Sequence, residues 1–424
     1  MSLLDQVRDS TRGLKADALL PALRRGHDDD IEEITDVAAL SDRSAVAAVR
    51  LVDGRDIFVP MVLAARDGSA RPRGTQPDRA WRRAEPADAI SMSALGAPPP
   101  LRVDHINPLP MLDPQRERGL DVDMTNDVRI VDDAVVAKWQ LLRQPDAIVG
   151  QRVVAHLSAA GFTDMPEPFA TVTWDDDVVL TATRFLPEAV DGWDWMLDEV
   201  LRMLAHGGAS PSWPAEIGRL TARMHAAAAR PTPVIDRPVA RAPLLDLAQH
   251  YQALLDTALD PELQTAVQRW RARFTEAIDV LAGTQDAEVV PLHRDLHPGQ
   301  FLRWRGGIAI CDFDGNPAFR AEEQDMRGPT AYDVAGILRG FDHVAIAAAN
   351  RAGASDALDH ARVWARDARG QALDAYLAEP GLPPLDTTIL GALESLSPLH
   401  EAVYAATYLP RWRYVPLAVL NWGW

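Results

Sequence analysis

The sequence predicts an α+β protein with three parts: an N-terminal α/β domain over residues 1–110, a hairpin-rich lobe over 111–187 and a mainly helical lobe over 188–424. Two observations support this prediction. Paired β-type runs joined by short Asp-containing turns recur up to residue 187, and helix-type runs dominate afterwards. The length of 424 residues and the 47% hydrophobic content are those of an ordinary globular protein with two to three domains.

The N-terminal domain begins with a segment rich in Ala, Leu and Asp, for which we expect short helices over residues 1–40. Ala45–Leu51 and Asp56–Leu63 are rich in Val, Ile and Phe and flank an Asp-Gly pair, which is a strong hairpin signal. Prolines cluster between residues 98 and 110 and place the first domain boundary there.

The second lobe alternates hairpins with one helix. Val128–Val131 and Ala134–Trp139 form one predicted hairpin, and Phe169–Trp174 with Val178–Phe185 forms another. Between them, Asp146–Gly161 is expected to be helical and to end at its glycine. Hairpins that alternate with a helix are typical of an α+β lobe.

The third lobe is mainly helical, with one β-type stretch over Val289–Asp314. The expected helices are Trp193–Ala205, Trp213–Ala229, Leu244–Thr257, Pro261–Ala282, Thr330–Arg351, Ala357–Leu377 and Leu385–Leu409.

Composition excludes several classes of function. The net charge of −18 argues against a nucleic-acid binder. No apolar run approaches the roughly 18 residues of a membrane span, and the N-terminus lacks a secretory signal pattern. Cys311 is the only cysteine, which excludes intrachain disulfides and a cysteine-built zinc site. We therefore expect a cytoplasmic monomer that binds no nucleic acid and no membrane.

The β-type stretch contains a candidate magnesium site. Phe301–Trp304 and Ile308–Cys311 are separated by three residues, and a hairpin with equal arms places Gln300 opposite Asp312. Asp314 follows two residues later and would point to the same face of the strand. Amide and carboxylate oxygens at one end of a hairpin are suitable ligands for Mg²⁺.

Asp295 lies on the loop before this hairpin, in the sequence His-Arg-Asp-Leu. A metal that holds phosphates, next to a carboxylate that accepts a hydroxyl proton, is the machinery for phosphoryl transfer to an alcohol. His293 and His297 flank Asp295 on a loop, so we expect packing or hydrogen bonding from them rather than metal ligation.

The spacing of Asp295, Gln300 and the sequence Asp-Phe-Asp from residue 312 resembles the catalytic and metal loops of kinases. With Gln in place of Asn and Asp-Phe-Asp in place of Asp-Phe-Gly, it resembles the aminoglycoside-phosphotransferase-like kinases. Residues 123–126, 185–193 and 332–342 look like the corresponding stretches of actinobacterial maltokinases. Residues 324–329, Gln-Asp-Met-Arg-Gly-Pro, are similar to a stretch of actinobacterial glucosamine kinases.

The resemblance implies a bilobal protein-kinase-like fold, ATP and Mg²⁺ as cofactors, and an N-terminal cap domain over residues 1–110. It implies that Asp295 is the catalytic base and contacts the substrate. It also implies that Gln300 and Asp312 are Mg²⁺ ligands and that Asp314 is a candidate third ligand. Two nucleotide contacts follow as well: Lys138 would bind the phosphates, and the backbone from Arg184 to Leu186 would meet adenine.

The resemblance also implies a structural role for Asp333, which would brace the catalytic loop. Lys138 is one of only two lysines in a chain that otherwise uses arginine, which favours a specific role for it.

The chain departs from the family pattern around the nucleotide. It has no Gly-rich phosphate loop, so the turn at Asp123–Arg129 would take that role. The helix after Lys138 has no glutamate to pair with this lysine, and Asp146 or Gln151 would have to replace it. A Walker A site is excluded because neither lysine lies in the required motif.

The substrate predicted from these observations is D-glucosamine, phosphorylated to glucosamine 6-phosphate. A cationic amino sugar needs carboxylates, and the C-terminal half offers several of them. Gln324 and Asp342 are the expected sugar contacts. The other acidic candidates are Glu322, Glu323, Asp325 and Glu401.

Four alternatives remain open at this stage. Maltose 1-phosphorylation and aminoglycoside phosphorylation would use the same catalytic hairpin. A nucleotide-binding pseudokinase would explain the missing glycines and glutamate, although Asp295 argues against it. A metal-dependent hydrolase built on His293, Asp295, His297 and Asp312 would act without a nucleotide.

Overall fold

The computed structural model describes residues 2–12, 31–65, 79–120, 126–143, 147–206, 210–315, 327–353 and 356–422. The chain divides into two compact units, Met1–Gln151 with Pro166–Pro187, and Arg152–Met165 with Glu188–Trp424. A division of the first unit into a cap domain and a lobe at residue 110 stays a prediction.

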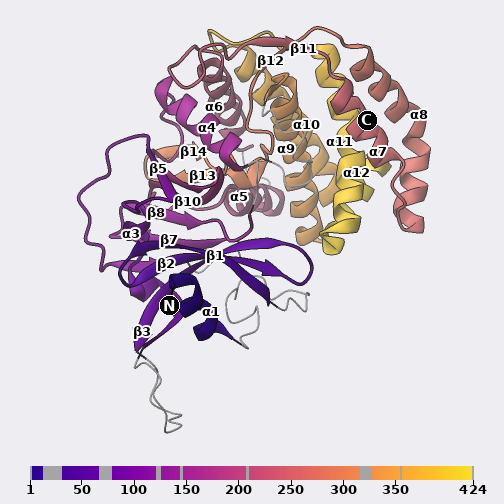
Figure 1. The fold of residues 1–424 in the computed structure, drawn as a ribbon. Coiled ribbons are helices and arrows are strands. Elements are labelled where there is room, and N and C mark those ends of the chain that lie inside the picture. The colour runs from indigo at the N-terminus through magenta and orange to yellow at the C-terminus, as the bar shows by residue number, and fades with distance from the viewer. Residues whose placement is uncertain are drawn as a thin grey trace. The chain divides into compact units, whose positions relative to one another are not determined.

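The N-terminal part of the first unit is a four-stranded antiparallel sheet, drawn in indigo and violet in Figure 1. Its strands, in spatial order, are β1 (Ile31–Ser41), β2 (Ser44–Leu51), β3 (Asp56–Ala65) and β4 (Arg79–Arg83). Helix α1 (Leu3–Thr11) begins with a capping box at Ser2 and Asp5 and packs against β1 and β4.

The second sheet of this unit has six antiparallel strands in the order β5-β9-β10-β8-β7-β6. Their bounds are β5 (Leu101–His105), β6 (Glu117–Gly119), β7 (Asp127–Val131), β8 (Val135–Trp139), β9 (Pro168–Trp174) and β10 (Asp177–Arg184). Three residues, 132–134, join β7 to β8, and two residues join β9 to β10. The aspartates of these turns, Asp132, Asp133, Asp175 and Asp176, all have positive φ, the conformation that tight hairpin turns require.

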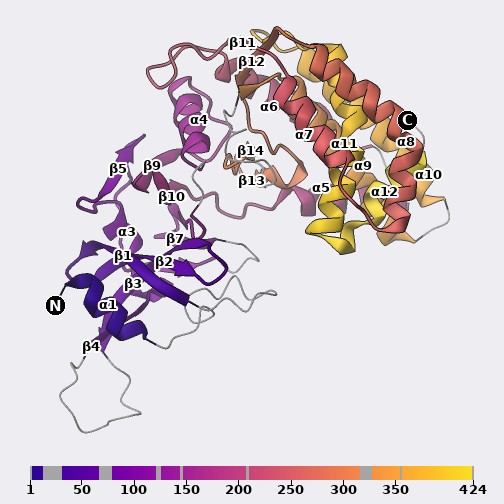
Figure 2. The ribbon, with the colours of Figure 1, turned by 45° about the vertical axis from the view of Figure 1, so that its right-hand side comes forward.

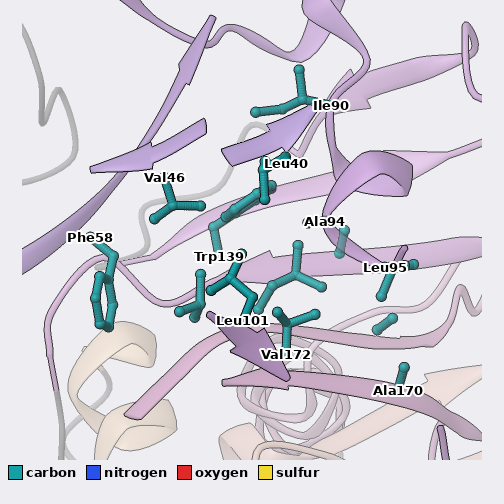
Figure 3. Close-up of a cluster of buried hydrophobic side chains, with 14 of the residues drawn as sticks. Leu40, Val46, Phe58, Ile90, Ala94, Leu95, Leu101, Trp139, Ala170 and Val172 are labelled. Atoms are coloured by element: carbon teal, nitrogen blue, oxygen red, sulfur yellow. The ribbon is translucent and has the colours of Figure 1, made fainter. Parts of the chain in front are cut away.

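One hydrophobic core joins the two sheets of the first unit. It combines side chains of β1 to β3 with side chains of the six-stranded sheet and of the segment around α3 (Ser91–Ala94). Figure 3 shows part of this core, with Trp139 among Leu40, Ile90 and Leu101. The short 3-10 helix η2 (Pro86–Asp88) precedes α3.

Helices form most of the second unit. They are α5 (Gly192–His206), α6 (Trp213–Ala228), α7 (Leu245–Leu255), α8 (Pro261–Gly283), α9 (Ala331–Ala352), α10 (Ala357–Leu377), α11 (Thr387–Thr407) and α12 (Tyr414–Trp422). Helix α9 is the central element: it packs on α5, α10 and α11, and α9 and α11 lie side by side in both views (Figures 1 and 2). Sixteen of its residues are buried, which explains why it is apolar nearly all round.

The remaining strands of the second unit hold the candidate catalytic segment. Strand β12 (Ala287–Pro291) pairs with β11 (Ala240–Ala242) and β15 (Arg327–Gly328). The short helix η3 (Pro298–Gln300) leads into the hairpin of β13 (Phe301–Trp304) and β14 (Gly307–Ile310). Helix α4 (Ala147–Ala159) spans the boundary between the two units in sequence.

The predicted hairpins of the first unit and the seven predicted helices of the third lobe are confirmed within a few residues. The expectation of short helices over residues 1–40 is confirmed by α1 but fails from residue 31 onwards, where the chain forms β1. Its buried residues Ile34 and Ala38 are four apart, since register shifts interrupt the period of two, and the pattern therefore imitates a helix. Within the described ranges, every helix is too short or too polar to cross a membrane.

Candidate active site

The predicted catalytic loop connects β12 to η3. Leu292 and Leu296 are buried and anchor the loop at both ends, while the side chain of Asp295 between them is 26% exposed. Arg294 has a positive φ of 66°, so the chain turns sharply just before Asp295. The two buried leucines therefore hold a loop on which the carboxylate of Asp295 stays partly exposed.

Asp333 of α9 holds this turn in place. Its carboxylate accepts hydrogen bonds from the backbone amides of His293 (2.9 Å) and Arg294 (3.0 Å) and lies 3.2 Å from Nε2 of His225. Burial alone would raise the pKa of Asp333, but the hydrogen bond from His225 and the nearby donors outweigh it and lower the pKa. These contacts confirm the predicted bracing role of Asp333.

His293 ties the catalytic loop to the segment after β14. Its Nδ1 accepts a bond from the Asp295 amide (3.4 Å), and its Nε2 lies 2.9 Å from the Cys311 carbonyl. The ring also packs on Phe313, with centroids 4.6 Å apart. Burial lowers the pKa of His293, which therefore stays neutral. The expected hydrogen bonding of His293 is therefore confirmed.

The hairpin register differs from the predicted one by one residue. Trp304 pairs with Gly307 and Phe301 with Ile310, so the loop has two residues instead of three and Gln300 lies opposite Cys311. Gly307, with φ of 125°, belongs to the return strand. The prediction that Gln300 lies opposite Asp312 is therefore wrong.

The orientation predicted for Asp314 also fails, because residues 311–315 form a turn rather than a strand. Asp312 has a φ of 63°, and strand alternation cannot place Asp312 and Asp314 on one face.

Asp295, Gln300 and Asp312 nevertheless lie close together. Burial raises the pKa of Asp295 well above its usual value, and the negative charge of Asp312 raises it further. Gln300 opposes this shift through a side-chain hydrogen bond to Asp295. The imidazole of His297 is also near, with Nε2 3.8 Å from a carboxylate oxygen of Asp295.

This donor set fits a Mg²⁺ ion. Mg²⁺ prefers oxygen ligands and typically takes only one or two carboxylates from the protein, with phosphates and water completing its shell. The amide oxygen of Gln300 and the carboxylate of Asp312 would supply such ligands beside the carboxylate of Asp295. No cluster of three His, Cys, Asp or Glu side chains suited to a metal occurs in the described ranges.

The expected nucleotide contacts lie in the first unit. Lys138 is half-buried on β8, where it pairs with Thr181 and Val128. The Arg184 amide donates to Glu167 and the Phe185 amide to Ala134.

Only parts of the other predicted nucleotide elements fall within the described residues. Gln151 lies on α4, whereas Asp146 and the first three residues of the predicted phosphate turn, 123–125, lie outside the described residues. The end of that turn, from Asp127, forms β7.

One of the two predicted sugar contacts, Gln324, lies outside the described residues. The other, Asp342 on α9, is completely buried between Arg339 (3.0 Å) and Arg369 (2.9 Å). Burial raises its pKa, although the two arginines oppose the shift. Its Oδ1 atom makes no hydrogen bond to any described residue.

Glu401 of α11 extends this cluster towards Asp295. Its Oε1 lies 3.1 Å from Nε of Arg339 and 2.7 Å from Nε2 of His343. Burial would raise the pKa of Glu401, but His343 and Arg339 outweigh it and lower the pKa. His343 in turn lies within electrostatic reach of His297, next to Asp295.

From the sequence, Glu401 was predicted only as one of several acidic candidates, and Arg339 and His343 were not predicted. Their spacing of four residues on one helix was the available signal, because it places an arginine and a histidine on one helix face.

Comparison with known proteins gives whole-chain matches, although no family model matches the sequence. The glucosamine kinase of Streptacidiphilus jiangxiensis is 33% identical over 410 residues, which cover 89% of this chain and 88% of that protein. The glucosamine kinase of Mycolicibacterium smegmatis is 33% identical over 383 residues, 85% of this chain and 94% of that one.

A solved structure of a glucosamine kinase in complex with glucosamine, ADP and inorganic phosphate matches with a TM-score of 0.73 and 27% identity, over 99% of both chains. These similarities confirm the predicted α+β fold class, in which a hairpin-rich lobe precedes a helical one. The chain belongs to the glucosamine kinase family.

Proposed function

We propose that the protein transfers the γ-phosphoryl group of ATP to the 6-hydroxyl of D-glucosamine. Family membership supports the choice of sugar, and the catalytic loop supports the chemistry. The products are glucosamine 6-phosphate and ADP, and the hydroxyl proton leaves with the base.

Asp295 is the base in this proposal. Its carboxylate is held by a loop whose backbone amides are fixed by Asp333, so it needs no reorganisation when the hydroxyl arrives. A pKa raised by burial makes Asp295 a better proton acceptor than an exposed aspartate, provided that it is ionised. Gln300, through its hydrogen bond, favours the ionised form.

Gln300 and Asp312, with Asp314 as a candidate third ligand, would hold Mg²⁺. The ion would neutralise charge on the nucleotide phosphates and beside Asp295. Lys138 would bind the nucleotide phosphates, and the backbone near Leu186 would contact adenine.

The observation that carries the choice of an amino sugar is a pair of incompletely satisfied acids. Glu401 Oε2 and Asp342 Oδ1 are buried, and neither makes a hydrogen bond to a described residue. A buried carboxylate oxygen without a donor is costly, and an ammonium group would satisfy it. Glu401, with 12% of its side chain exposed, is the accessible member. We propose that it meets the ammonium group, and that Asp342 and Gln324 complete the sugar site.

The test compares sugars on the wild type and on Glu401→Gln. The wild type should prefer glucosamine to glucose in kcat/KM and should not phosphorylate N-acetylglucosamine, which has no ammonium group. Loss of one charge-assisted bond predicts that the substitution lowers this preference by roughly 10- to 150-fold.

Glu394→Gln is the matched control. Glu394 also lies on α11 and pairs with an arginine of the same cluster, Arg369, but its side chain is more exposed. This variant should keep the preference. Equal kcat/KM for glucose or maltose and glucosamine in the wild type would reject the amino-sugar assignment and favour a maltokinase.

A further inference from the structure

Arg129 of β7 is the most completely bonded buried cation of the first unit's described part. Its side chain is 0% exposed. Nε and Nη2 donate to Asp127 (3.2 and 2.8 Å), and Nη1 donates to Glu117 (3.0 Å). The other two hydrogen bonds go to the carbonyls of Ala84 (2.7 Å) and Glu85 (3.4 Å). All five N–H donors of the guanidinium are therefore used.

These bonds connect two segments that are far apart in the sequence. Ala84 and Glu85 follow β4, at the end of the four-stranded sheet, whereas Glu117 and Asp127 belong to the strands of the six-stranded sheet. Arg83 adds a second connection, because its Nη2 donates to Asp127 at 2.9 Å.

A chain of hydrogen bonds continues from Arg129 to the strand of Lys138. Ser91 donates to Glu117 through both its amide (3.1 Å) and its hydroxyl (3.0 Å). The same hydroxyl accepts a bond from Nε1 of Trp139 at 3.0 Å. Trp139 is the residue after Lys138, and its ring lies beneath the Arg129 guanidinium, 5.7 Å away. Figure 3 shows Trp139 in the core beside Ile90 and Ala94, which flank or belong to the Ser91 helix.

The strand register places Lys138 directly on this assembly. Asp127 pairs with Trp139, Val128 with Lys138 and Arg129 with Ala137. Side chains alternate along a strand, so the Arg129 cluster occupies one face of the β7–β8 ribbon and Lys138 the other. A shift of either strand would therefore move Lys138.

We propose that Arg129 is a positioning residue for nucleotide binding: with Glu117, Asp127 and Ser91 it fixes the β7–β8 hairpin, and thereby Lys138, to the segment 84–91. The inference rests on the proposed role of Lys138. Lys138 lies on β8, on the face away from Arg129. The buried cluster constrains the same strand from the opposite face of the sheet.

The experiment measures ATP affinity directly, by equilibrium binding without sugar. Ser91→Ala removes the hydroxyl that links Glu117 to Trp139, and Trp139→Phe removes the donor while keeping an aromatic ring over Arg129. Each should raise the Kd for ATP by about threefold to tenfold, as expected for one lost buried hydrogen bond that acts on the site.

Arg116→Met is the control. Arg116 pairs with Asp132 beside the same hairpin, but its side chain is 61% exposed, and its loss should leave the Kd for ATP unchanged. Lower thermal stability of Ser91→Ala and Trp139→Phe with an unchanged Kd for ATP would show a purely structural cluster and overturn the proposal. Because no sugar is present, failure of the glucosamine assignment would not affect this result.

Discussion

In the proposed reaction, Asp295 is the residue on which the chemistry depends most directly. Asp295→Asn keeps the size and most hydrogen bonds of the side chain but removes the proton acceptor. We expect an unchanged Kd for ATP and a kcat lowered by roughly 10²- to 10⁴-fold, the usual worth of general-base assistance.

The wild-type rate should also fall at acid pH, with a midpoint above the pKa of an ordinary aspartate, because the pKa of the base is raised and only the ionised form accepts a proton. Steady-state kinetics between pH 4 and 8 check both points. A variant that kept more than about a tenth of the rate would remove Asp295 from this role.

Asp312 and Gln300 should differ in their contribution to Mg²⁺ binding. Asp312→Ala removes a charged ligand and should abolish turnover at any accessible Mg²⁺ concentration. Gln300→Ala removes a neutral amide, so added Mg²⁺ should restore part of its activity. Titration of the rate with Mg²⁺ separates the two, and a more severe defect in Gln300→Ala would contradict the ligand assignment.

Asp333 should contribute stability that depends on pH in a defined direction. Its pKa is lower in the folded protein than the usual 3.8, so its stabilising effect is fully present above about pH 4 and is lost as the pH falls through the folded value. Asp333→Asn should therefore lower the free energy of unfolding by about 3 kcal/mol near neutral pH, because backbone donors lose a charged acceptor. Urea unfolding from pH 3 to 7 should show this difference shrinking on the acid side. A difference that stays constant with pH would mean that the charge of Asp333 is not what stabilises the loop.

At the scale of elements, the start of α5 is packed tightly against the catalytic hairpin. A Cβ atom at Gly192 would lie 2.1 Å from the Pro298 carbonyl and 2.5 Å from the Phe301 carbonyl. Gly192→Ala must therefore displace η3 and with it Gln300. We expect a loss of stability of about 1–3 kcal/mol, as for overpacking elsewhere, and a raised Mg²⁺ requirement.

Gly218→Ala provides a control with the same kind of clash at a different place. Its Cβ would lie 2.0 Å from the Ala372 carbonyl, where α6 meets α10. This variant should lose comparable stability while the Mg²⁺ dependence of its rate stays that of the wild type. If both variants, measured well below their melting temperatures, showed the same Mg²⁺ dependence, the contact at Gly192 would not govern the metal site.

The same hairpin shows why local patterns predict elements better than registers. The β-type runs and their turn were correctly predicted, but Gly306 and Gly307 can both adopt turn conformations, so the sequence leaves the loop length open. Only the pairing of Trp304 with Gly307 decides it. Similarly, β1 was missed because its burial depends on pairing with β2 and on the register shifts along it.

The candidate site likewise contains residues that the local sequence predicts and residues whose role depends on contacts distant in the sequence. Asp295, Gln300 and Asp312 were predicted because they lie within 18 residues of one another and share a recognisable spacing. The environments of Glu401 and Arg129 were not predicted from the sequence, because each environment consists of residues that only the fold brings together. Glu401 meets Arg339 and His343 from another helix, and no periodicity in α11 indicates this contact.

At the scale of the whole molecule, the charge of −18 bears on how each substrate reaches the protein. A negative protein attracts a cationic sugar and repels an anionic nucleotide over distances set by the Debye length. This length falls from about 30 Å at 0.01 M salt to about 8 Å at 0.15 M salt. Salt should therefore act in opposite directions on the two substrates.

We expect kcat/KM for glucosamine, with ATP saturating, to fall as salt rises from about 0.01 to 0.15 M, where screening becomes effective. Glucose is the matched neutral substrate, and its smaller kcat/KM should stay constant over the same range. The salt effect on glucosamine should also fade at pH values where its amine is deprotonated, because the attraction needs the ammonium charge. Stopped-flow or steady-state kinetics with both sugars, at neutral and alkaline pH, provide the measurement. A salt effect of equal size for glucose would trace it to the protein or the nucleotide rather than to the charge of the sugar. An increase in kcat/KM for glucosamine with salt would show that the negative field does not guide this substrate to Glu401.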